Sequence, residues 1–87
     1  MSFINIPIET GKELSAERNC NAAIIRAVET YLDSGSPDVE LPGPKVPRVQ
    51  VPFKLPRSLS RRVQNVALSK DTSEGIIVIK AILRQYS

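Results

Sequence analysis

The second half of the chain changes from a two-residue hydrophobic period to a helical one. Between residues 48 and 55 every second residue is apolar, which is the alternation of a strand with one buried face. Pro56 suits the first turn of a helix, where its missing N–H is harmless. Apolar residues then recur at helical spacing: Leu59, Val63, Val66 and Ala67. The pattern predicts a strand followed by a helix that ends near Lys70.

A second helix is expected from residue 74 to about residue 86, with Ser73 as its N-cap. Residues 75–79 are rich in β-branched side chains, so a buried strand is the alternative. The apolar run continues almost to the last residue, and this length favours the helix. The expected core-facing positions are Val78, Ala81 and Ile82. A second apolar stripe remains, formed by Ile76, Ile79, Leu83 and Tyr86.

The first half of the chain predicts one strand and one helix. Residues 3–8 alternate like a short edge strand, and Thr10 and Glu13 have the spacing of a capping box. A helix is predicted from residue 12 or 15 to residue 32, with Gly35 as its stop. Its apolar positions are Leu14, Ile24, Val28, Tyr31 and Leu32, so one face should be buried. We expect this face to pack on the second stripe of the C-terminal helix, or on that of a dimer mate.

Proline marks the boundary between these two parts. Six of the seven prolines fall between residues 37 and 56, and the segment before Pro47 has little periodicity. We therefore expect three regions: an N-terminal strand–helix extension (1–35), a proline-rich linker (36–47) and a C-terminal domain (48–87).

The two halves of the chain also differ in net charge. Residues 1–44 carry a net charge of −4 and residues 45–87 one of +7, which suggests a unit that binds a polyanion beside an appendage with another role. Cys20 is the single cysteine, and histidine is absent. A disulfide, a zinc site and the usual catalytic arrangements are thereby disfavoured, so we expect no enzyme activity, metal or cofactor. With no membrane span or secretory leader expected, a cytoplasmic protein is the simplest interpretation.

The C-terminal elements carry a set of residues at fixed gaps. The set comprises the segment 49–56 (VQVPFKLP), the helix positions Leu59, Val63, Val66 and Ala67, the pair Thr72 and Ser73, and finally Val78, Ala81 and Ile82. In its order and spacing this set resembles the ribbon-helix-helix family, which includes the Arc and methionine repressors. The resemblance covers about 40 of the 87 residues.

The resemblance implies a mostly α-helical fold with a two-stranded antiparallel ribbon. In the family two chains each give one strand, so it implies a homodimer, with higher order possible on DNA. A lone strand would also leave its backbone groups unpaired, which independently favours a partner strand. Since Pro52 has no N–H, we expect Val49, Val51 and Phe53 to carry the hydrogen bonds between the strands.

The implied function is that of a sequence-specific, repressor-like regulator that lays its ribbon in the major groove of duplex DNA. The outward residues Arg48, Gln50 and Lys54 would contact base edges. Pro52 departs from the family, because it offers a base no hydrogen bond. Phosphate contacts are expected from Thr72, Ser73 and Gly75 at the start of the second helix, from Arg57 and Arg61, and further from Arg62 and Lys70.

Two alternatives stay open at this point. The acidic residues 1–44 can instead belong to a protein-interaction module, an antitoxin or adaptor, that grips a partner protein. The first half can also be a degenerate second copy that pairs within the chain, because residues 4–8 (INIPI) match residues 49–53 (VQVPF). Against this, Pro7 and Asn19 are only 12 residues apart, compared with 21 between Pro52 and Ser73.

Overall fold

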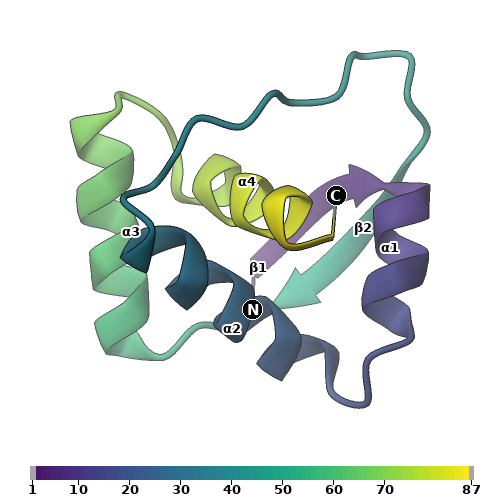
Figure 1. Cartoon of the computed structure of the whole chain (residues 1–87), viewed down its shortest axis with the longest axis horizontal. Coiled ribbons are helices and arrows are strands. Elements are labelled where there is room, and N and C mark those ends of the chain that lie inside the picture. The colour runs from purple at the N-terminus through teal and green to yellow at the C-terminus, as the bar shows by residue number, and fades with distance from the viewer. Residues whose placement is uncertain (1, 87) are drawn as a thin grey trace.

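The chain forms two strand–helix–helix units in succession. A computed structural model describes residues 2–86 (Figure 1). The elements in order are β1 (Ser2–Pro7), α1 (Ile8–Ser15), α2 (Cys20–Asp33), β2 (Arg48–Phe53), α3 (Arg57–Ser69) and α4 (Glu74–Tyr86). The expected class, mostly helical with a two-stranded antiparallel sheet, is confirmed.

The two strands of the sheet come from the two halves of the same chain. β1 pairs antiparallel with β2, so that Asn5 lies opposite Gln50, Ile4 opposite Val51 and Ile6 opposite Val49. The prediction that β2 pairs with its copy in a second chain is therefore wrong. β1 has the same alternation and a proline at the matching place, so it can pair with β2 without a second molecule. The N-terminal strand is half of the sheet and not an extension to it.

Both prolines of the ribbon occupy positions that need no hydrogen-bond donor. Pro52 lies opposite Phe3, and Pro7 lies opposite Arg48. Hydrogen-bonded and non-hydrogen-bonded pairs alternate along an antiparallel ladder, and a proline fits only the second kind. This register leaves the ladder bonds of β2 to Val49, Val51 and Phe53, the residues that Pro52 had led us to expect.

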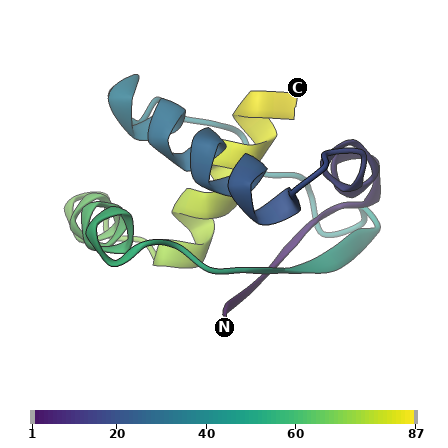
Figure 2. The ribbon, with the colours of Figure 1, turned by 90° about the horizontal axis from the view of Figure 1, so that it is seen from below.

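All four helices lie on one side of the ribbon (Figure 2). α4 packs against β1, α2 passes the end of the ribbon where β2 ends, and α3 and α1 lie on the two sides (Figure 1). α2 packs against α4, which confirms that the N-terminal and C-terminal helices are in contact; packing on the second stripe of α4 stays a prediction. The largest fully buried side chains are Ile6, Leu14, Ile24, Val28, Tyr31, Val63, Ile77, Val78 and Ile82. The second stripe of α4 is only half-buried.

The helix predicted from residue 12 or 15 to residue 32 is two helices. Residues 16–19 separate α1 from α2, and Thr10 lies inside α1 instead of capping it. The cap of α2 is Asn19, whose side chain accepts a hydrogen bond from the backbone N–H of Ala22 at 3.1 Å. Ser73 does the same for α4, as predicted, by accepting from the N–H of Ile76 at 3.3 Å. The strand alternative for residues 75–79 is excluded.

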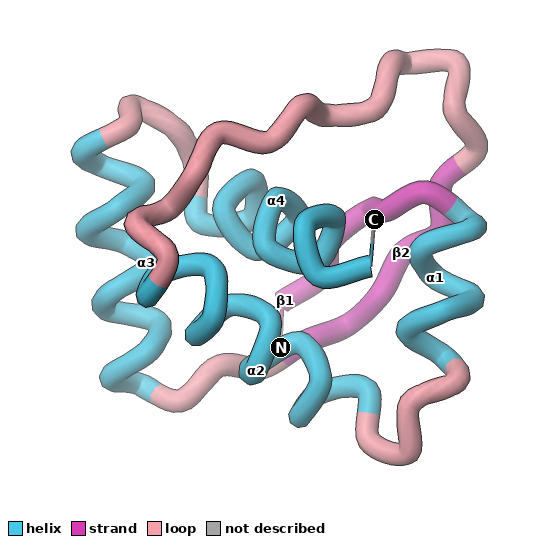
Figure 3. The backbone as a smooth tube through the Cα atoms, viewed as in Figure 1, coloured by secondary structure: helices cyan, strands magenta, loops and turns pink. Residues whose placement is uncertain are grey.

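The proline-rich segment 34–47 is packed onto the helices. It runs from the end of α2 past α4 to the start of β2 (Figure 3). The hydroxyl of Tyr31 donates to the carbonyl oxygen of Pro37 at 2.7 Å, and Lys80 contacts Asp38 at 3.5 Å. Ser36 is buried. The segment therefore joins two halves of one sheet and does not separate two bodies.

Candidate nucleic-acid interface

The face of the ribbon away from the helices carries polar side chains at its centre. Ile4, Ile6 and Phe53 turn into the core, so their neighbours turn outward. Asn5 and Gln50 are both exposed and lie opposite each other. The outward positions are Phe3, Asn5 and Pro7 on β1, and Arg48, Gln50 and Pro52 on β2. Neither strand contains an acidic residue.

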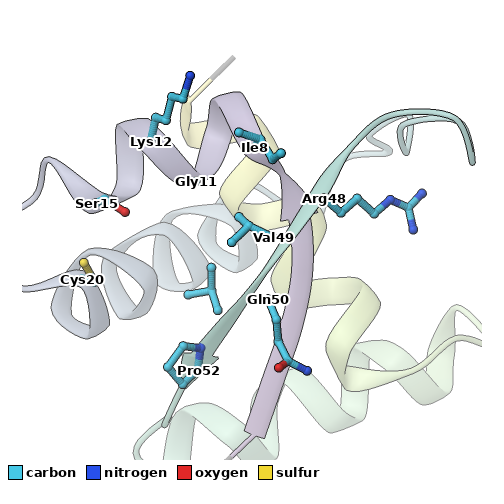
Figure 4. A pocket seen from close by; sticks show the side chains of 10 residues that line it. Ile8, Gly11, Lys12, Ser15, Cys20, Arg48, Val49, Gln50 and Pro52 are labelled. Carbon is cyan, nitrogen blue, oxygen red and sulfur yellow. The ribbon is translucent and has the colours of Figure 1, made fainter.

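Arg48 and Gln50 occupy different places on this face. Figure 4 shows both side chains on the side of β2 away from α1, whereas Val49 points toward α1. Gln50 is central because its register partner is Asn5. Arg48 lies at the start of β2, where its Nη2 donates to the carbonyl oxygens of Pro42 at 3.2 Å and Gly43 at 3.4 Å. The linker thus orients the Arg48 guanidinium at one end of the ribbon.

Lys54, the third predicted base-contacting residue, follows β2 directly. Its backbone is held by Asn21 of α2, which accepts from the Lys54 N–H at 2.8 Å and donates to the Lys54 carbonyl oxygen at 3.0 Å. The Lys54 side chain is exposed. Sequence reasoning missed Asn21, and it also missed Asn5 and Phe3 as outward residues. The likeness of residues 4–8 to residues 49–53 was the signal that pointed to Asn5.

Basic residues of α3 gather next to Lys54. A shallow pocket of about 450 Å³ is lined by Lys54, Arg57 and Arg61. Leu55, Ser60 and Gln64 complete its wall. The structure thus brings the predicted phosphate-contacting residues Arg57 and Arg61 together with a predicted base-contacting one. Three cations within one exposed pocket suit a phosphodiester backbone.

The other two basic residues of the expected set face different partners. Arg62 donates from Nη2 to the Asp33 carboxylate at 3.0 Å, and Lys70 donates from Nζ to the carbonyl oxygen of Ser36. Both contacts tie the second half of the chain to the end of α2 or to the linker. Arg62 and Lys70 therefore contribute to the fold and lie outside the basic pocket.

The start of α4 is a poorer phosphate site than the sequence suggested. Thr72 donates its backbone N–H to the carbonyl oxygen of Ala67 at 2.8 Å, and the Ser73 side chain is engaged as the N-cap. Glu74 brings a carboxylate into the first turn, where it accepts from Ser60 at 3.2 Å and from Gln64 at 3.4 Å. This negative charge opposes a phosphate near Thr72, Ser73 and Gly75.

Three acidic residues of the first half contact residues of the second half. Asp33 pairs with Arg62, and Asp38 pairs with Lys80. Glu17 accepts a hydrogen bond from the Tyr86 hydroxyl at 3.2 Å. These contacts join acidic residues of the first half to residues of the second. Glu9, Glu13, Glu29 and Glu40 are exposed, and the alternative that the acidic segment binds a partner protein stays a prediction.

An apolar groove lies along β2, between this strand and α1, and Arg48, Gln50 and Pro52 also border it. It has a volume of about 710 Å³ and is lined by Val49, Val51, Ile8, Gly11 and the thiol-bearing Cys20, among others (Figure 4). Val49 is 39% exposed, whereas Ile4, its counterpart in β1, is 3% exposed. α1 has 8 residues against 13 in α3, so the two halves cover their strands unequally.

Two further observations concern other kinds of site. Among residues 2–86, no three His, Cys, Asp or Glu side chains are grouped so that they can hold a metal ion. None of the helices in the same span has the length and apolar character needed to cross a bilayer. Comparisons with protein-family models, with curated proteins and with solved structures returned no match.

Proposed function

We propose that this chain binds duplex DNA and lays the exposed face of the β1–β2 ribbon in the major groove. A two-stranded ribbon has the width that this groove accepts. The observation that carries the proposal is the register of the ribbon, which places Asn5 and Gln50 side by side on the face away from the helices. One chain then supplies both strand–helix–helix units that the ribbon-helix-helix family takes from two chains.

The outward side chains have the chemistry of direct base readout. The amide groups of Asn5 and Gln50 can each make a paired contact with adenine, and Arg48 and Lys54 can contact guanine. Each good contact of this kind contributes about 1–3 kcal/mol to the choice between base pairs. Such a ribbon discriminates among DNA sequences, which is what a repressor-like regulator requires.

The basic pocket supports the same orientation. Lys54, Arg57 and Arg61 lie where the ribbon ends and α3 begins, so they can contact the phosphates beside the groove. Each neutralised phosphate releases bound counterions, which makes the affinity depend on salt. We therefore expect tight binding at low salt and a steep loss of affinity as salt rises.

Binding to fluorescent duplexes, measured by anisotropy over a series of salt concentrations, tests this proposal. A pool of duplexes is first enriched on the full chain, and the enriched sequence is then compared with its scrambled form. Gln50→Ala and Lys54→Ala should each weaken binding to the enriched duplex by about 5–150-fold, which corresponds to about 1–3 kcal/mol.

Two matched variants control for the loss of a side chain. Lys45→Ala removes an exposed charge from the linker, and Gln85→Ala removes an exposed amide from the end of α4. Both should bind DNA as the wild type does. If Lys45→Ala and Gln85→Ala weaken binding as much as Gln50→Ala and Lys54→Ala do, the ribbon is not the interface. If no duplex binds at low salt, the chain does not bind DNA.

A further inference from the structure

We infer that the DNA site of this chain has no twofold symmetry, and that one chain occupies it in one defined orientation. This inference rests on the proposed function. A homodimer presents the same residues to both half-sites, so its operator mirrors the protein's twofold axis. Here one chain contributes both strands, and nothing requires the two halves to read the same bases.

The two strands agree at the centre of the ribbon and differ at its ends. When residues 4–8 are aligned with residues 49–53, Asn5 matches Gln50 and Pro7 matches Pro52. The same alignment sets Phe3 against Arg48, and it sets Glu9 against Lys54. At the start of the strand, β1 therefore has an aromatic ring where β2 has a guanidinium. After the end of the strand, the first half has an acidic residue where the second half has a basic one.

Antiparallel pairing places these differing residues at opposite ends of the ribbon. Phe3 is 55% exposed and lies opposite Pro52, so one end presents an apolar surface. Arg48 lies opposite Pro7 at the other end. An apolar surface suits the methyl group of thymine, whereas arginine suits the two acceptors of guanine. The two ends of the ribbon thus select different base pairs.

The helices that flank the ribbon also differ in charge. α3 contains Arg57, Arg61 and Arg62 and no acidic residue. α1 contains Glu9 and Glu13, and its Lys12 contacts Glu9 at 3.7 Å. The phosphates on the α3 flank meet a basic pocket, whereas those on the α1 flank meet a helix with a net negative charge. Only one orientation on the DNA satisfies both the ribbon ends and the flanks.

Site-directed DNA cleavage tests this orientation. In a Cys20→Ser background, an iron chelate is attached to Ser58→Cys on α3 or to Glu13→Cys on α1, both of which are exposed positions. Each protein is bound to a duplex with one enriched site and labelled at one end. We expect the α3 probe to cut one flank of the site and the α1 probe to cut the opposite flank. Sedimentation of the complex should give one chain per duplex.

Salt dependence gives a second readout of the unequal flanks. The Arg57→Ala, Arg61→Ala double variant should lower the slope of log K against log salt by about 2, or about 1 per lost phosphate contact. Lys12→Ala on α1 is the matched control and should leave the slope unchanged.

The outcomes separate this inference from the proposed function. DNA binding with equal cleavage of both flanks by each probe overturns the asymmetric site and leaves DNA binding intact. An enriched sequence that is palindromic and binds two chains would also overturn the asymmetric site and leave DNA binding intact. If no duplex is bound, both proposals are wrong.

Discussion

The side chain of Asn21 holds the backbone of Lys54 with two hydrogen bonds, one to its N–H at 2.8 Å and one from Asn21 to its carbonyl oxygen at 3.0 Å. Asn21 lies in the first turn of α2, and Lys54 follows the last residue of β2. The contact thus fixes the end of the ribbon to the helix layer. It also fixes the backbone of Lys54, one of the three basic residues that line the basic pocket.

Replacing Asn21 should therefore affect both stability and DNA binding. Each of the two hydrogen bonds contributes about 0.5–1.5 kcal/mol, so Asn21→Ala should lower the free energy of unfolding by about 1–3 kcal/mol. DNA affinity should fall as well, because the backbone that carries the Lys54 side chain is no longer fixed to α2. Chemical denaturation and anisotropy measure the two effects. Asn21→Asp keeps the acceptor for the Lys54 N–H, so its stability should lie between that of the wild type and that of Asn21→Ala. An Asn21→Ala variant that is as stable as the wild type contradicts the prediction.

Gly11 allows α1 to approach β2 closely. A Cβ atom added at this position would lie 2.6 Å from Cγ1 of Val49, well inside normal contact distance. Alanine favours a helix over glycine by about 1 kcal/mol, but overpacking destabilises by about 1–3 kcal/mol. We expect Gly11→Ala to lower the free energy of unfolding or to displace α1.

The Val49 side chain provides the control for this substitution. Val49→Ala removes the atom that the new methyl group would meet, so Gly11→Ala should be much better tolerated in that background. A double-mutant cycle by thermal or chemical denaturation measures the coupling. Additive effects of the two substitutions would show that the close approach is unimportant.

Tyr31 links the stability of the fold to alkaline pH. Its side chain is 1% exposed, and its hydroxyl donates to Pro37. Burial raises the pKa of the phenol above the ordinary value of 10.0; the Asp38 carboxylate raises it further, and Arg84 opposes the change. The unfolded chain therefore loses this proton at a lower pH than the folded chain. The contribution of Tyr31 to stability is complete below about pH 10 and declines as the pH rises toward the folded pKa.

Tyr31→Phe isolates this effect from the titration of other groups. At neutral pH the variant should be less stable by about 0.5–1.5 kcal/mol, because one hydrogen bond is lost. The difference in stability between wild type and variant should shrink above about pH 10. There the unfolded wild-type chain ionises Tyr31 more readily than the folded chain does, which lowers the stability of the wild type alone. Urea denaturation from pH 7 to 11 measures it. A difference that stays constant or grows with pH would argue against the raised pKa.

The second half of the chain should not be a stable monomer on its own. A fragment of residues 46–87 keeps β2, α3 and α4 but loses the strand that pairs with β2 and the helix that packs on α4. Exposed strand edges and apolar faces favour association. We expect the fragment to sediment as a dimer or larger species, in contrast to the full chain. A folded, monomeric fragment would show that the first half is dispensable for the core.

Several helices and both strands follow from local physics and could be predicted from the amino-acid order alone. The two-residue alternation of residues 49–55 can bury one face only as a strand, and Pro56 and Ser73 mark where helices begin. Breaks that depend on a single polar residue were harder to predict. α2 begins anew after residues 16–19 because the Asn19 side chain caps it, and a repeating apolar pattern does not reveal that cap.

Sequence patterns left the partner of β2 undecided between a second copy of the chain and residues 4–8, because an unpaired strand shows that a partner is needed and not which segment supplies it. The alternation in residues 49–55 is equally satisfied by a second copy and by residues 2–7. Tertiary structure decided between them, since pairing within the chain also lets α2 cover α4 and brings the linker over the core. The candidate site divides in the same way: Arg48, Gln50 and Lys54 were identifiable as outward residues from their alternation with apolar neighbours. Asn5, Phe3 and Asn21 became part of the site only through contacts between segments far apart in the chain.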